Sequence, residues 1–172
     1  MASKISEFDL DLAFAEAVRQ SDVFQTWLVG RTKFASLVPD LRLLDKEQGQ
    51  RKAKHWWRHW WCRVPELERD SETDVFIVFE NIGGRRIALH VENKPPHGKF
   101  TFQQAESYAP RARHMMGKAQ FMGYHDFTTV IVAPNAFLTS NEAGAAQFDV
   151  RLAYEDVGRY VPLFADAVRS AG

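Results

Sequence analysis

The sequence predicts an α/β protein. Two apolar, β-branched runs flank a glycine-rich turn at 81–84, and a third unbroken apolar run covers 127–133. Apolar residues at helical spacing precede and follow these runs. Strands that alternate with helices in this way are typical of a sheet covered by helices. At 172 residues and 45% hydrophobic content, the chain can bury a sizeable core, so we expect one domain over 1–172.

The elements follow from local patterns. A helix is expected over about 10–29, because its apolar residues recur at helical spacing and Gly30 is a natural stop. Residues 31–54 form a connecting segment with room for a short helix. Thr101 and Pro110 predict the cap and the kink of a helix over about 100–116. The remaining expectations are a hairpin over 74–94, a buried strand at 127–133, a loop at 136–147, a strand at 148–154 and a closing helix at 155–168.

Charge and cysteine content narrow the class of protein. Lys and Arg number 22 and Asp and Glu also number 22, so the formal net charge is zero and binding to nucleic acid would depend on local patches. The single cysteine, Cys62, excludes an intramolecular disulfide. Neither end carries a signal peptide or a long apolar run, so we expect a cytoplasmic protein that does not contact the membrane.

A tryptophan-rich segment at 55–62 has two interpretations. At helical spacing its four tryptophans would form a broad apolar face, which favours a core or a subunit interface. Interleaved basic residues such as Arg58 instead suit a platform on which bases stack and phosphates are neutralised. The first interpretation is the commoner one for such a face.

The predicted hairpin carries charged residues to one place. Asp74 begins its first strand, while Glu92 and Lys94 lie on one face of the second together with His90, because side chains alternate along a strand. Two carboxylates beside a lysine can hold a divalent cation and support phosphodiester hydrolysis. The carboxylates supply hard oxygen ligands for Mg²⁺, and the lysine can orient or activate water.

Asp74, one hairpin and then Glu92-x-Lys94 resemble the motif of the PD-(D/E)XK, or restriction-endonuclease-like, nuclease superfamily, with Thr73 in place of its proline. Gln104-x-x-x-Tyr108 is similar to the helix motif of the RecB-type branch. The resemblance covers about 70–165. It implies a restriction-endonuclease-like core with a mixed central β-sheet flanked by helices.

The resemblance also implies roles for individual residues. It implies Mg²⁺ or Mn²⁺ as the cofactor. In the superfamily that the chain resembles, the first helix often supplies one more acidic residue to the site. Glu16 is the candidate here, although a surface pair with Arg19 explains it as well. The implied site consists of Asp74 and Glu92 with the backbone carbonyl of Asn93 as metal ligands, Lys94 at the attacking water, and Gln104 and Tyr108 as supports.

Together these features predict a magnesium-dependent nuclease acting on DNA, in a context of repair, recombination, mobile elements or defence. A homodimer or a larger complex is compatible with the tryptophan-rich segment. The alternative is a non-catalytic module that binds nucleic acid or protein on the same fold. The residues expected to contact nucleic acid are basic: Arg58, Lys99, Arg111, Arg113 and Lys118.

Overall fold

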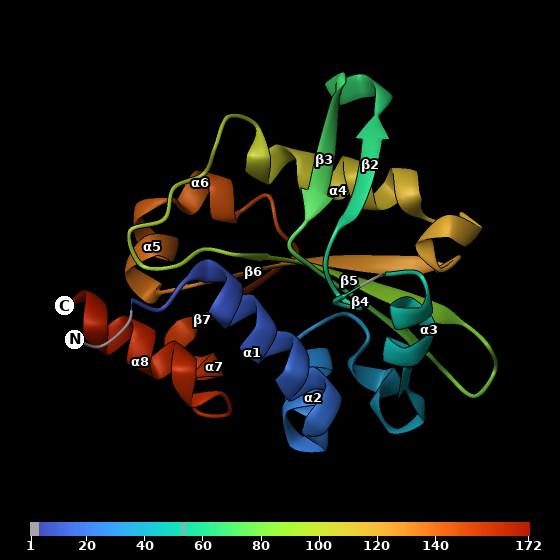
Figure 1. Cartoon of the computed structure of the whole chain (residues 1–172), viewed down its shortest axis with the longest axis horizontal. Coiled ribbons are helices and arrows are strands. Elements are labelled where there is room, and N and C mark those ends of the chain that lie inside the picture. Colours follow the sequence, from blue (N-terminus) through green and yellow to red (C-terminus); the bar gives the residue numbers. More distant parts are fainter. Residues whose placement is uncertain (1–3, 53) are drawn as a thin grey trace.

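The computed structural model describes residues 4–52 and 54–172, which form an α/β structure with a five-stranded mixed central sheet flanked by helices (Figure 1). No helix within these residues is long and apolar enough to cross a membrane. The elements are α1 (Glu7–Gln20), α2 (Asp22–Gly30), η1 (Ala35–Asp40), β1 (Arg42–Leu43), α3 (Asp45–Gln50), β2 (Trp60–Val64), η2 (Pro65–Leu67), β3 (Arg69–Thr73), β4 (Val75–Glu80), β5 (Arg86–Asn93), α4 (Gln104–Met115), η3 (Ala119–Phe121), β6 (Asp126–Ala133), α5 (Asn135–Ser140), α6 (Glu142–Ala145), β7 (Val150–Ala153), α7 (Tyr154–Val157) and α8 (Pro162–Ala171).

The central sheet has the order β1-β4-β5-β6-β7. Strands β4 and β5 form the predicted antiparallel hairpin, and its turn contains Gly84 at φ +80°, a left-handed conformation that glycine adopts without steric cost. Strands β6 and β7 run parallel to β5. Because parallel neighbours need a long crossover, α4 links β5 to β6 and covers the sheet.

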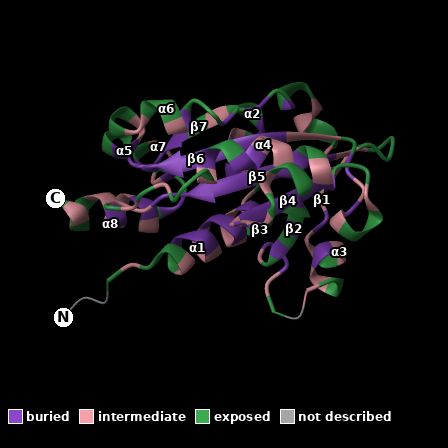
Figure 2. Cartoon of the chain, turned by 90° about the horizontal axis from the view of Figure 1, so that it is seen from above, coloured by how far each residue is buried: buried purple, intermediate pink, exposed green. Residues whose placement is uncertain are grey.

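Alternation along the hairpin divides the core between the two faces of the sheet. Val75, Ile77 and Phe79 pack with α1, α2 and α8 on one face. Phe76 and Val78 point to the other face, which α4 and the two-stranded β2–β3 ribbon cover. Both faces of the strands are therefore buried, as Figure 2 shows for the centre of the molecule.

The tryptophan-rich segment is not a helix. It forms a turn followed by β2, which pairs with β3 in a ribbon that was not predicted as a unit. Trp56, Trp57 and Trp60 are buried, and Trp61 alone is half-exposed at 52%. Three of the four indoles thus belong to the core, in agreement with the first interpretation of this segment.

Two predicted helices are each divided. The helix expected at 10–29 begins at Glu7 and breaks at Ser21, whose hydroxyl accepts a hydrogen bond from the N–H of Phe24 and starts α2. The helix expected at 155–168 is split into α7 and α8, because Pro162 lacks an N–H and suits the first turn of a new helix. The loop expected at 136–147 contains the short helices α5 and α6.

Candidate active site

The charged residues of the hairpin meet at one end of the sheet. Val75 pairs with Val91, which places Asp74 beside Glu92. The carboxylate of Glu92 is fully buried, and Nζ of Lys94 lies 2.8 Å from its Oε1. The N–H of Asn93 donates to Oδ2 of Asp74 at 3.3 Å. Strand register alone therefore brings two carboxylates and one ammonium group together.

Helix α4 holds Glu92 from the other side. Gln104 and Tyr108 stand four residues apart on one face of the helix. Nε2 of Gln104 donates to Oε1 of Glu92 at 2.7 Å, while the hydroxyl of Tyr108 donates to Oε2. The amide of Gln104 is fixed in this orientation, because its Oε1 accepts from the N–H of Thr101 at 3.0 Å. Both oxygens of Glu92 are thus held.

An acidic residue that the sequence did not single out lies next to this cluster. Oδ1 of Asp11, in α1, accepts from Nδ2 of Asn93 at 2.8 Å. Burial is the main reason that the pKa of Asp11 is raised to about 8; the bond from Asn93 opposes this rise, and the charges of Glu7 and Glu92 contribute to it. The available signal was an acidic residue within the apolar stripe of a helix, since Phe14 and Ala15, three and four residues later, are buried on the same face.

Burial and neighbouring carboxylates affect Asp74 in the same way. Burial raises its pKa well above the ordinary range, and the negative charges of Glu92 and Asp11 raise it further. The site therefore contains more carboxyl groups than nearby cations can neutralise.

Glu16, the acidic residue expected from the first helix, is not brought to the site. Its carboxylate forms an ion pair with Arg19 one turn along α1 and accepts from Gln20 at 2.9 Å. The surface-pair interpretation is correct for this residue. Asp11, five residues earlier, is the acidic residue of α1 that reaches the strand ends.

Arg111 was expected to contact nucleic acid, and this prediction is wrong. The residue is 1% exposed because it projects from the same face of α4 as Tyr108, toward the sheet. Its Nε donates to Oγ1 of Thr73 at 3.0 Å, Nη1 donates to Ser71, and the guanidinium lies 4.1 Å from the ring centroid of Tyr108. Within residues 4–52 and 54–172, Nη2 has no hydrogen-bond partner.

A buried hydrogen-bonded chain continues from Arg111. Since Arg111 can only donate, Thr73 accepts from it and directs its own hydroxyl hydrogen to Nδ1 of His90, 3.0 Å away. His90 must then donate from Nε2 to the hydroxyl of Tyr124 at 3.1 Å, and Tyr124 donates to the carbonyl of Ala112. Burial lowers the pKa of His90 well below its ordinary value, and the charge of Arg111 lowers it further, so the imidazole is neutral. This chain ties α4 to Thr73, the residue before Asp74 at the end of β3, and to His90 of β5.

The other basic residues lie at different distances from the site. Lys99 is exposed on the loop between β5 and α4. Arg58 lies 4.9 Å from the ring centroid of Phe8, and its charge acts on Asp11, so it flanks the acidic end of the sheet. Arg113 is exposed but stands nine residues along α4 from Gln104, about 14 Å by helical rise, and Lys118 lies beyond the end of that helix. Of these four residues, Arg58 is the one whose charge acts on the site, and Lys99 follows Lys94 by five residues; contact of either with nucleic acid stays a prediction.

The donor set fits a hard divalent cation. Asp74, Glu92 and the carbonyl of Asn93 offer oxygen ligands, which are the ligands that Mg²⁺ prefers. The buried, mutually repelling carboxyls would be stabilised by two added positive charges. In the part of the chain that the structure describes, no three His, Cys, Asp or Glu side chains form a ready-made metal cluster.

Comparisons with known proteins give no relative. No protein-family model, no curated protein and no solved structure matches the chain.

Proposed function

We propose that this protein is a magnesium-dependent nuclease with a restriction-endonuclease-like core, which hydrolyses phosphodiester bonds in DNA. One observation carries the proposal: Asp74, Glu92 and Lys94 meet at the sheet end, and Gln104 and Tyr108 of α4 hold Glu92 in place. The resemblance of the same five residues to the superfamily motif supports it independently of the geometry.

The chain's own residues have separable tasks in this reaction. A bound Mg²⁺ would supply a polarising charge for the scissile phosphate and for water. Asp74, Glu92 and the carbonyl of Asn93 would bind it. Tyr108 and Gln104 fix the orientation of the Glu92 carboxylate.

Lys94 is placed to act on the attacking water. Its side chain is 7% exposed, and Nζ lies 2.8 Å from Oε1 of Glu92 and 5.7 Å from the ring centroid of Phe100, which leaves the ammonium group few orientations. Held in this way, it can donate to water or to a phosphate oxygen and offset negative charge that builds on the phosphate. Lys99 and Arg58 would neutralise neighbouring phosphates.

A non-catalytic binding module is the alternative. The oxygens of Glu92 already receive hydrogen bonds or an ion pair from Lys94, Gln104 and Tyr108, which satisfies this buried carboxylate without any metal. The two functions differ in their need for a divalent cation.

Cleavage assays distinguish them. Purified protein is incubated with linear, circular and single-stranded DNA in Mg²⁺, Mn²⁺ or chelator. We expect cleavage that requires metal and falls by about 100-fold or more in Lys94→Gln, the usual size of a lost proton-transfer group. Lys46→Gln, at an exposed position of α3, is the matched control and should cleave normally. Thermal unfolding of both variants establishes that they are folded.

Metal binding gives a second readout. Calorimetric titration of Mn²⁺ should show affinity at least tenfold weaker in Glu92→Gln and unchanged in Glu16→Gln, since Glu16 lies outside the site. Cleavage by folded Lys94→Gln at the normal rate would refute the catalytic assignment. Absence of metal binding by the unaltered protein would favour the binding module.

A further inference from the structure

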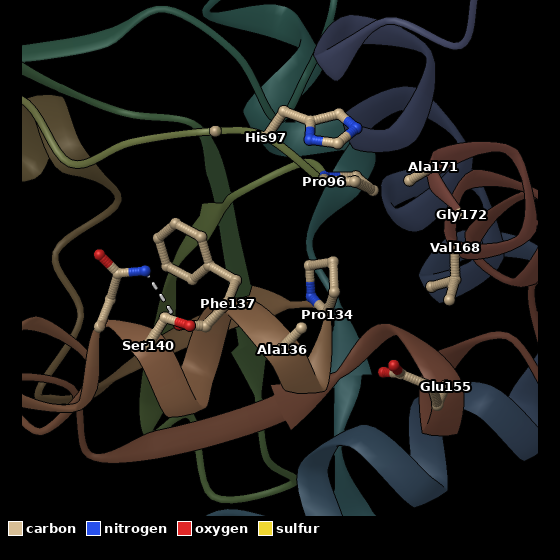
Figure 3. A pocket seen from close by; sticks show the side chains of 12 residues that line it. Pro96, His97, Pro134, Ala136, Phe137, Ser140, Glu155, Val168, Ala171 and Gly172 are labelled. Atoms are coloured by element: carbon tan, nitrogen blue, oxygen red, sulfur yellow. Dashed lines mark hydrogen bonds between the residues drawn. The ribbon is translucent and has the colours of Figure 1, made fainter.

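A cavity of about 430 Å³ (Figure 3) lies beyond the carboxyl end of β5, the end that carries Glu92 and Lys94. Strands β5, β6 and β7 are parallel, and their carboxyl ends lead into Pro96 and His97, into Pro134, and into Glu155. The crevice outside the carboxyl ends of parallel strands is where α/β sheets usually bind ligands.

We infer that this cavity binds one unpaired nucleotide of the DNA, beside the phosphate that is cleaved. This inference rests on the proposed function and adds a substrate class to it. It predicts that single-stranded or frayed DNA is bound in preference to a closed duplex.

The first support is continuity with the site. Lys94 and the cavity wall belong to one short segment, because Pro96 and His97 follow the lysine by two and three residues. The N–H of Lys94 donates to the carbonyl of Val132 at 2.9 Å, and Pro134 of the opposite wall follows Val132 by two residues. A strand whose phosphate lies at Lys94 would therefore bring an adjoining nucleotide to the cavity mouth.

The second support is the shape of the wall. The N–H of Gly98 donates to the carbonyl of Pro95 at 2.8 Å, and a Cβ atom at Gly98 would lie only 2.8 Å from that same oxygen. This tight turn fixes Pro96 and His97 in place before any ligand binds. A preformed wall lowers the entropic cost of binding.

The third support is the lining chemistry. Phe137, Pro134 and Val168 present apolar surface, against which the flat face of a base can pack. Glu155 of α7 lines the cavity (Figure 3), and its carboxylate accepts from the N–H of Asn135, in the first turn of α5, at 3.1 Å. An oriented carboxylate accepts hydrogen bonds from exocyclic amino groups such as N4 of cytosine, which thymine lacks. Because the cavity measures about 430 Å³, the size of a small-ligand pocket, we expect it to hold a single base and not a base pair, so the base must leave its pair to enter.

The test combines a protein variant with a change in the DNA. Ala136, exposed on α5 at the cavity, is replaced by phenylalanine to fill the space, and Ala119→Phe on η3, outside this cavity, is the control. Binding is measured by fluorescence anisotropy in chelator, so that no cleavage occurs. The probes are an end-labelled single-stranded DNA octanucleotide, the same oligonucleotide with an abasic site at each position in turn, and the corresponding duplex.

We expect Ala136→Phe to bind the intact single strand about tenfold more weakly, the effect of losing one stacked base, and Ala119→Phe to bind normally. One abasic position should weaken binding to the unaltered protein by a similar factor and have no further effect in Ala136→Phe. Equal affinity of Ala136→Phe and the unaltered protein for the single strand, or abasic effects that persist in this variant, would overturn the inference.

The outcomes separate this inference from the proposed function. If the unaltered protein cleaves DNA in a metal-dependent manner and Ala136→Phe binds the oligonucleotide normally, the proposed nuclease activity stands and the cavity has no part in DNA binding. If Ala136→Phe binds the oligonucleotide more weakly but the unaltered protein does not cleave DNA, the cavity is a nucleotide site and the proposed nuclease activity is wrong.

Discussion

Replacing Asp11 with asparagine is expected to stabilise the protein, by an amount that grows with pH. Asp11 is 6% exposed and has a pKa of about 8, against an ordinary value of 3.8. Between these values the native state retains a proton that the unfolded chain releases, so folding becomes less favourable as the pH rises. Each pH unit above the ordinary pKa costs about 1.4 kcal/mol, and at pH 7 the penalty that asparagine removes reaches about 4 kcal/mol.

Asparagine keeps the contact that aspartate makes, because its carbonyl oxygen can still accept from Nδ2 of Asn93. Urea unfolding followed by tryptophan fluorescence, in chelator at pH 5, 6, 7 and 8, gives the stability difference between variant and unaltered protein. The difference should increase from about 2 kcal/mol at pH 5 to about 4 kcal/mol at pH 7. Asp40→Asn, at an exposed position at the end of η1, controls for the loss of a surface charge. If the stability difference between Asp11→Asn and the unaltered protein does not change with pH, Asp11 does not have a raised pKa in the native state.

Two further predictions concern stability. The pKa of His90 is lowered in the native state, so the unfolded chain binds a proton that the native state does not as the pH falls below 6.5. Below pH 6.5 we expect the free energy of unfolding to fall by up to about 1.4 kcal/mol per pH unit. Urea titrations at pH 7.5 and 5.5 should show this loss of stability in the unaltered protein and not in His90→Gln. An equal loss in the variant would contradict the prediction. Gly144→Ala should destabilise the protein by about 1–3 kcal/mol, because its Cβ would lie 2.5 Å from Cε2 of Phe100. Gly49→Ala, whose Cβ meets no atom closer than 3.7 Å in α3, should stabilise it by about 0.5–1 kcal/mol, and equal effects at both glycines would show that this crowding is not felt.

The β4–β5 hairpin could be predicted because its signals are local. The turn contains a glycine at positive φ, and the flanking strands alternate between two faces. The β2–β3 ribbon could not, because Trp60 and Trp61 are adjacent and apolar, which hides the period of two that distinguishes a strand. Only the packing of Trp60 against the far side of the sheet shows which indole faces the core.

The candidate site also contains residues that the sequence predicts and residues that it does not. Asp74, Glu92 and Lys94 are brought together by the register of neighbouring strands, which the turn position determines. Asp11 is joined to them through Asn93, across 82 residues of sequence, and a contact of that range depends on how α1 packs on the sheet. The prediction that Arg111 contacts nucleic acid is wrong because it assumed that a charged side chain is exposed. Arg111 follows Tyr108 by three residues, and this spacing places both side chains on the inward face of α4.

The β4–β5 turn offers a point of attachment for labels. It lies at the opposite end of the hairpin from Asp74 and Lys94, separated from them by the length of β4, six residues or about 20 Å. Ile82 at its tip is 86% exposed, and the turn is closed locally by the bond from the N–H of Arg85 to the side chain of Asn81. A dye attached through Ile82→Cys would leave the length of the turn and its bond from Arg85 to Asn81 unchanged, so the strand register would be kept. It would report on DNA binding from outside the region that the DNA is proposed to occupy.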